Sequence, residues 1–117
     1  MTNFNLSQYE KDSLTYVLRK YKKTNIPALI DDASIVLKML TIDTIPLFTL
    51  CTYTGCIDRI IKELDKEVAA TASNISLYNS EEDIREAIDK YNFACTCYEA
   101  ANKMFESISN LESTELE

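Results

Sequence analysis

The scarcity of glycine constrains this chain more than any other feature of its sequence. The 117 residues include one glycine and two prolines. Tight β-hairpin turns favour glycine because they require positive φ angles, so a fold built from many short hairpins is disfavoured. Glycine-rich loops that bind phosphate need at least two glycines and are excluded. We therefore expect a mainly helical chain.

Apolar spacing and capping residues predict four helical segments. They are expected over about 8–23, 27–40, 46–72 and 80–109. Ser7 and Glu10 have the spacing of a capping box at the start of the first helix. Ser80 precedes three acidic residues at the start of the last, where carboxylates favour the helix dipole.

The third segment is ambiguous at its start. Residues 46–54 are apolar and rich in threonine, which fits either a helix or an alternating strand. Gly55 follows directly, and a glycine inside a helix indicates a kink or a close approach of two helices.

The fold class that follows is all-α. We predict a single helical domain over 1–117, formed by a bundle of about four helices. Two shorter helices are expected to pack on a long antiparallel helical hairpin. Residues 1–6 and 111–117 are expected to be frayed tails.

The side chains available for catalysis are few. The chain has no histidine, which excludes His-dependent nucleophilic sites and His-ligated metals. Its four cysteines are spaced C-x4-C and C-x-C, not C-x2-C as in zinc sites, so we expect buried free thiols. Carboxylates share helix faces at Glu63 and Glu67 and at Glu86 and Asp89, but lysines are interspersed, as on solvated surfaces. We expect no cofactor, no metal and no enzymatic activity.

Charge is unevenly distributed along the chain. Residues 1–60 carry a net charge of +1 and residues 61–117 a net charge of −8, giving −7 in total. The acidic half repels nucleic-acid backbones and anionic membranes. Two interpretations of this charge are open: it keeps the protein soluble, or it complements a basic surface on a partner protein.

The expected location is the cytoplasm. The N-terminal residues are polar and show no signal-peptide pattern. The longest uncharged run, residues 44–57, is shorter than the roughly 17 residues that a membrane-spanning helix needs.

The last helix carries two neighbouring apolar stripes. The second, spaced by four, three and four residues, consists of Phe93, Cys97, Ala100 and Met104. A helix with so wide an apolar arc contacts more than one neighbour. The first two helices cover this stripe within the chain, or it forms a homodimer seam or a groove for a partner helix.

These observations predict a non-enzymatic protein–protein interaction module of the inhibitor, immunity or adaptor type. Its partner would be a protein with a basic surface, or a second copy in a homodimer. The candidate partner-binding residues are Phe93, Cys97, Ala100, Met104, Glu82, Glu86 and Asp89.

Two alternatives remain open. One is a bundle that binds a small molecule or nucleotide between residues 44–57 and the last helix. The other, less favoured, is an all-α enzyme that uses carboxylates and magnesium, for which Glu86 and Asp89 supply half of the required pattern.

Overall fold

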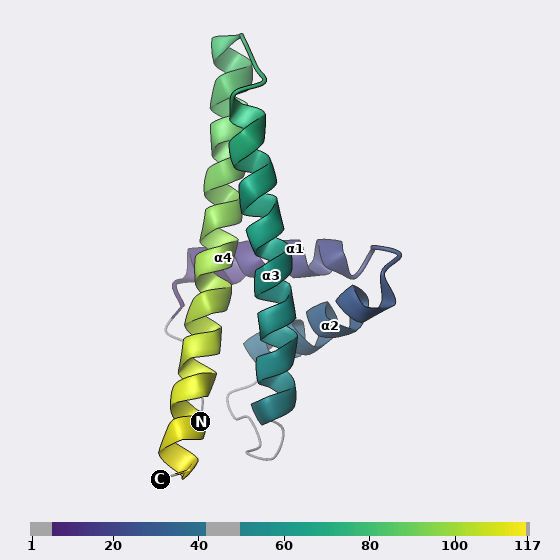
Figure 1. Cartoon of the computed structure of the whole chain (residues 1–117), viewed down its shortest axis with the longest axis vertical. Helices are drawn as coiled ribbons and strands as arrows, with labels where there is room; N and C mark the ends of the chain where they lie inside the picture. Colours follow the sequence, from purple (N-terminus) through teal and green to yellow (C-terminus); the bar gives the residue numbers. More distant parts are fainter. Residues whose placement is uncertain (1–5, 42–49, 117) are drawn as a thin grey trace.

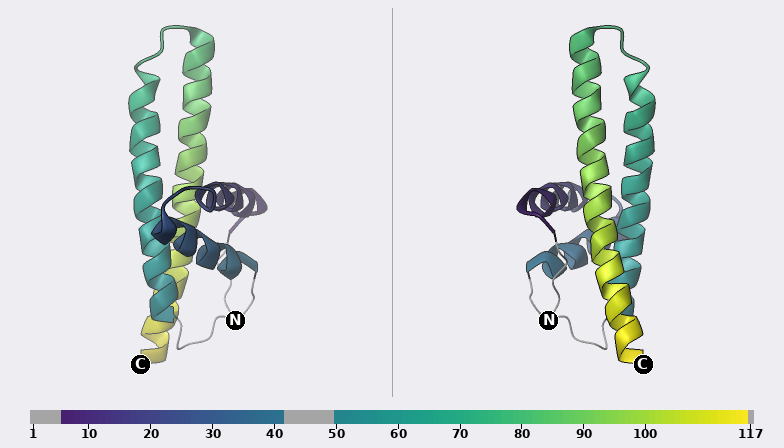
Figure 2. Two further views of the ribbon diagram at one scale, coloured as in Figure 1. Left: turned by 90° about the vertical axis from the view of Figure 1, so that its right-hand side faces the viewer. Right: turned by 90° about the vertical axis from the view of Figure 1, so that its left-hand side faces the viewer.

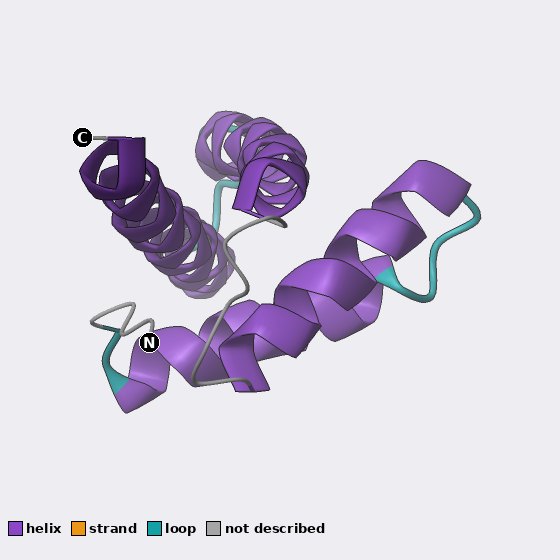
Figure 3. Ribbon diagram, turned by 90° about the horizontal axis from the view of Figure 1, so that it is seen from below, coloured by secondary structure: helices purple, strands orange, loops and turns teal. Residues whose placement is uncertain are grey.

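The computed structural model describes residues 6–41 and 50–116, with side chains over 6–41 and 54–108. Within these ranges the chain forms four helices and no strand (Figure 3), which confirms the all-α prediction. The helices are α1 Gln8–Tyr21, α2 Pro27–Thr41, α3 Leu50–Ile75 and α4 Glu81–Leu116.

Local sequence signals set three of the helix starts. The Ser7 hydroxyl accepts from the Glu10 backbone N–H at 3.1 Å, and the Glu10 carboxylate accepts from the Ser7 N–H at 2.9 Å. This confirms the capping box. Ser80 likewise accepts from the Asp83 N–H at 3.1 Å. Pro27 is the first residue of α2, where a missing N–H costs little.

The structure answers two open questions about α3. The backbone is already helical from Leu50 onward, which confirms the predicted helix over residues 50–54 and excludes the alternative strand there; residues 46–49 lie outside the described residues. A Cβ atom added at Gly55 would meet the Arg59 guanidinium at an ordinary 3.5 Å. No close helix crossing among the described residues therefore depends on this glycine.

The predicted end of the last helix is also wrong. α4 continues to Leu116 rather than ending near Ser109, so its helical bounds include residues 111–116. This stretch contains neither glycine nor proline, and leucine and glutamate favour helix. The predicted N-terminal tail falls mostly on residues 1–5, which lie outside the described residues.

Two long helices form the axis of the molecule. α3 and α4 lie side by side, run in opposite directions and are joined by a short connection (Figure 1). The 36 residues of α4 span about 54 Å at 1.5 Å per residue, which equals the longest dimension of the molecule, 54 Å. α1 and α2 pack across one side of this pair, where α1 contacts α4 and α2 contacts α3 (Figure 2).

The hydrophobic core lies where the four helices meet. Each helix contributes buried side chains: Leu14, Val17, Leu18 and Tyr21 from α1; Leu29, Ala33, Val36 and Met39 from α2; Cys56, Ile57, Ile60 and Leu64 from α3; Cys97, Ala100, Ala101, Met104 and Ile108 from α4. This part, which we call the base, therefore has one continuous core.

Beyond the base, α3 and α4 continue as a projecting pair of helices (Figure 1). We call residues 72–89 the hairpin arm. The structure describes every side chain of the arm, and Ala87 is the one that is buried. The arm is thus held together by contacts between two helices alone.

Candidate functional site

The predicted apolar stripe of α4 lies against α1. Cys97, Ala100 and Met104 have no exposed surface and belong to the core of the base. The Cys97 thiol donates a hydrogen bond to the Ser13 carbonyl oxygen at 3.4 Å. In this structure the stripe is covered within the chain, so these three residues offer no surface to a partner.

Phe93, the fourth residue of the stripe, is only half-buried. Its ring meets the ring of Tyr16 edge to face, with 5.7 Å between centroids and 83° between planes. Tyr16 itself is exposed. A surface hollow of about 400 Å³ adjoins this pair, between α1, α3 and α4.

The acidic candidates lie in the hairpin arm and are exposed. Glu82, Glu86 and Asp89 follow one another at intervals of four and three residues, which places them on one face of α4. The Glu86 carboxylate lies 3.8 Å from the Lys90 ammonium. Glu82 and Asp89 form no ion pair with any residue that the structure describes.

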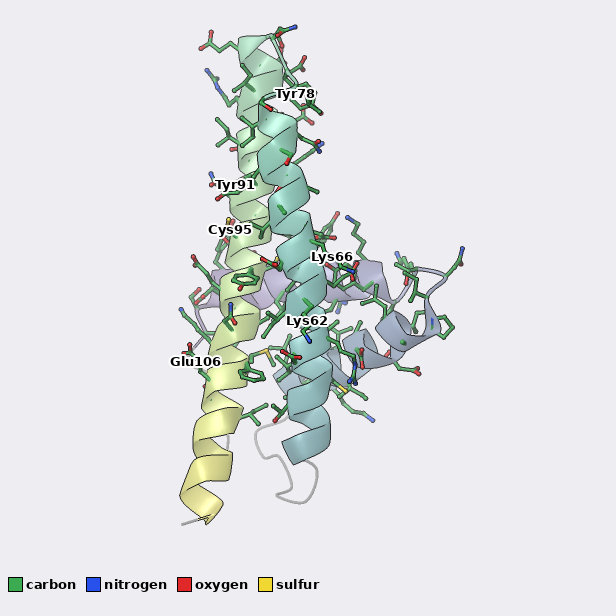
Figure 4. All side chains as sticks on the ribbon, in the orientation of Figure 1. Lys62, Lys66, Tyr78, Tyr91, Cys95 and Glu106 are labelled. Carbon is green, nitrogen blue, oxygen red and sulfur yellow. The ribbon has the colours of Figure 1, made fainter. Side chains whose placement is uncertain are left out.

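The arm also exposes large apolar side chains. Leu77 is 72% exposed, Tyr78 42% and Ile88 40%. Figure 4 shows Tyr78 near the tip, where α3 and α4 are connected. Exposed apolar groups next to carboxylates are the composition of a protein-binding surface with electrostatic selectivity.

A small hollow lies between the two helices of the arm. Its volume is about 160 Å³, and it is lined by Thr71, Asn74, Tyr78, Asp83, Glu86, Ala87 and Lys90. The carboxylates of Asp83 and Glu86 and the ammonium group of Lys90 thus line this hollow, which is about as large as one side chain.

Sequence reasoning missed a salt bridge in the base. The Asp32 carboxylate is 7% exposed and accepts two hydrogen bonds from the Arg59 guanidinium, at 2.7 and 2.9 Å. These bonds raise the pKa of Arg59. The signal was present, because Asp32 lies three residues after Leu29 and four before Val36, on the buried face of α2.

The described cysteines are free thiols. Cys56 and Cys97 are buried and Cys95 is half-buried; the side chain of Cys51 lies outside the described residues. Burial raises the pKa of the Cys97 thiol to about 12, with a smaller contribution from Glu67. Burial likewise raises the pKa of Cys56, and Asp32 adds to the effect. Both thiols are thereby held in the protonated, unreactive form.

Two tyrosines have raised pKa values. The hydroxyl of the buried Tyr21 has no hydrogen-bond partner among the described residues. Burial and the nearby carboxylate of Glu67 raise its pKa. The neighbouring Cys95, one helical turn further along α4 (Figure 4), raises the pKa of Tyr91.

The described side chains provide little for a metal or a buried ligand. Within the described residues, no three His, Cys, Asp or Glu side chains form a group suited to a metal ion. Glu63 pairs with Lys66 at 3.6 Å. In the segment where a small ligand was considered, the described Cys56 and Ile57 are buried and fill the core.

Comparison with known proteins adds no relative: no family model, no curated protein and no solved structure matches the chain. Over the described residues, no helix has both the length and the apolar character needed to cross a membrane.

Proposed function

We propose that this chain is a non-enzymatic protein–protein interaction module that binds a basic surface of a partner protein through its hairpin arm. The observation that carries the proposal is the exposure of Leu77, Tyr78 and Ile88 on a part of the fold that extends beyond the core. Apolar side chains in this position are accessible to a partner protein, whose binding would remove them from water.

The charges of the arm define the kind of partner. The arm has five carboxylates and one arginine. Arg85 pairs with Glu81 at 3.4 Å, and Lys90, just outside the arm, pairs with Glu86. These pairs leave Glu82, Asp83 and Asp89 without an ion-pair partner among the described residues, so they are free to attract lysines and arginines.

The proposal also includes the arrangement and setting of the molecule. In this arrangement two shorter helices pack on one part of a long antiparallel hairpin, and the rest of the hairpin is the arm. The arm is thereby accessible to a partner, which suits an inhibitor, immunity protein or adaptor. We place the protein in the cytoplasm and assign it no catalytic role. The chain has no histidine, and the buried thiols of Cys56 and Cys97 are poor nucleophiles, which supports a binding role.

Affinity capture from native lysate tests this proposal. The arm variant Glu82→Lys/Glu86→Lys/Asp89→Lys should lose at least about 90% of the captured partner, since each reversal places a cation against a basic surface. The partner should be basic, and its capture by the unmodified chain should weaken as salt is raised.

A matched control separates local from overall charge. The variant Asp31→Lys/Glu99→Lys/Glu106→Lys changes the net charge equally at exposed positions outside the arm, and it should retain the partner. Equal capture by both variants, with helical circular dichroism intact, would contradict a role for the arm.

A further inference from the structure

A second surface, opposite in charge to the arm, lies between α1 and α2. It is a groove of about 490 Å³ lined by Gln8, Lys11, Asp12, Thr15, Arg19, Lys22, Ser34, Leu37, Lys38, Leu40 and Thr41. The residues that α1 contributes are not those it buries in the core. They recur along α1 at intervals of three and four and therefore line one side of the helix.

The charged residues of this groove are mainly cations. Lys11, Arg19, Lys22 and Lys38 are exposed, and none pairs with a carboxylate of the described residues. Asp12 is the one carboxylate of the lining, and it accepts a hydrogen bond from Gln8 at 2.9 Å. The groove is therefore locally positive in a chain whose net charge is −7.

Two ion pairs of the base explain this excess of cations. Glu10 of α1 binds Lys103 of α4 at 2.9 Å, and Asp32 of α2 binds Arg59 of α3 at 2.7 Å. Both carboxylates point to the long helices and fasten α1 and α2 to them. The cations that line the groove therefore have neither Glu10 nor Asp32 as a counter-charge.

The floor of the groove is apolar. Leu37 and Leu40 are half-buried and lie against the core. The Ser34 hydroxyl is already engaged, because it donates to the Ile30 carbonyl oxygen at 2.8 Å. A floor of leucine with a rim of cations fits an acidic helix that carries apolar side chains, and it fits a free phosphate or a nucleic-acid backbone less well.

The hairpin arm has the complementary chemistry. Building on its proposed role in protein binding, we propose that the arm of one copy binds the α1–α2 groove of a second copy. Glu82 and Asp89 would face the cationic rim, and Ile88 would meet the leucine floor. The acidic face from Glu82 to Asp89 spans about 10 Å at 1.5 Å per residue, which is shorter than α1, so the groove is long enough to hold it.

This contact joins two different surfaces of the chain. The arm projects along the long axis, beyond α1 and α2 of its own chain (Figure 2). A copy whose arm is bound still has a free groove, and a copy whose groove is bound still has a free arm, so association is head to tail and continues into a ring or an open chain.

Sedimentation velocity of the purified full chain tests this arrangement. At about 20 mM salt the weight-average mass should rise with concentration to at least about twofold above the monomer mass, because opposite charges are weakly screened. At about 0.5 M salt the mass should return to 13.4 kDa.

Charge exchange between variants makes the test specific. The groove variant Lys11→Glu/Lys22→Glu/Lys38→Glu and the arm variant Glu82→Lys/Glu86→Lys/Asp89→Lys should each stay monomeric. An equimolar mixture should associate, since the native arm of the groove variant meets the native groove of the arm variant, and the reversed arm meets the reversed groove. Each triple reversal changes the net charge of −7 by six, so both variants remain negative and overall attraction does not explain their association. The control Asp31→Lys/Glu99→Lys/Glu106→Lys should self-associate like the unmodified chain.

Three results would overturn the proposal. The unmodified chain could stay monomeric at every protein and salt concentration, or the mixture could stay monomeric although both variants are helical. The third is that the groove variant alone self-associates like the unmodified chain. If the arm variant still loses a foreign basic partner in the capture experiment, the proposed function stands and self-association alone is refuted.

Discussion

α3 and α4 run through both the base and the hairpin arm, but the two regions differ in what surrounds these helices. In the base, α1 and α2 cover one side of α3 and α4, and side chains such as Leu64 and Met104 have no exposed surface. In the arm no third helix covers the pair, and Ala87 is its one buried side chain. Stability is therefore concentrated in the base, and the arm is left with surface available for contact.

The largest expected difference between the two regions is the cost of truncating an apolar side chain. Leu64→Ala should lower the free energy of unfolding by about 2–5 kcal/mol, because it leaves a cavity in the core. Ile88→Ala should cost less, because that residue is 40% exposed and lies outside the core. Urea denaturation followed by circular dichroism measures both, and equal costs would refute the contrast.

Breaking an ion pair should likewise cost more stability in the base than in the arm. Arg59→Ala should cost about 1–3 kcal/mol, since it strands the buried Asp32 carboxylate, although water reaches the Arg59 side. Asp32→Ala should cost less, because the guanidinium left behind is solvated. Arg85→Ala in the arm should cost less than about 0.5 kcal/mol, since both partners there are exposed. A double-mutant cycle on each pair gives the coupling, and a stronger arm pair would contradict this order.

A pH titration probes the contact that fastens α1 to α4. The Ser7 backbone N–H and, to a smaller extent, Lys103 lower the pKa of Glu10 from 4.5. A lowered folded-state pKa stabilises the protein above the unfolded-state value, and this contribution disappears as pH falls through the folded-state value. The stability difference between the unmodified chain and Glu10→Gln should therefore shrink below about pH 4.5. A difference that stays constant to pH 2.5 would show that the charge of Glu10 contributes nothing.

The smallest expected effect belongs to the start of α4. Ser80→Ala removes the cap that accepts from the Asp83 N–H and should cost about 0.5–1 kcal/mol. Because Ala87 is the one buried side chain of the arm, amide hydrogen exchange should accelerate in the first turns of α4 more than in the core of the base. Uniform acceleration along the chain would mean that the arm and the base unfold as one unit.

The sequence predicted the local features of this fold well. Helical spacing and the Ser7 and Ser80 caps depend on neighbours within four residues, and the structure confirms them. The end of α4 was missed because no glycine or proline marks it. The spacing of α2 places Asp32 on its buried face, but the partner Arg59 was missed because it lies 27 positions away and no local pattern joins the two residues.

The candidate site was predictable in one part and not in the other. The carboxylates of Glu86 and Asp89 were expected on a solvated face, and both residues are exposed. Whether the apolar stripe of α4 is core or interface could not be predicted, because it depends on where α1 packs. An apolar stripe on an isolated helix is compatible with a core or with an interface, because either one removes it from water.

The sequence by itself determined that this chain is helical and that its acidic charge lies in the second half, because helix formation and charge follow from residues close together in the chain. The tertiary structure alone decided that Cys97 and Met104 are core, that residues 72–89 project as an arm, and that the cations of α1 and α2 line an outer groove. These outcomes depend on where α1 and α2 cross the long helices, since burial is set by contacts between residues far apart in sequence.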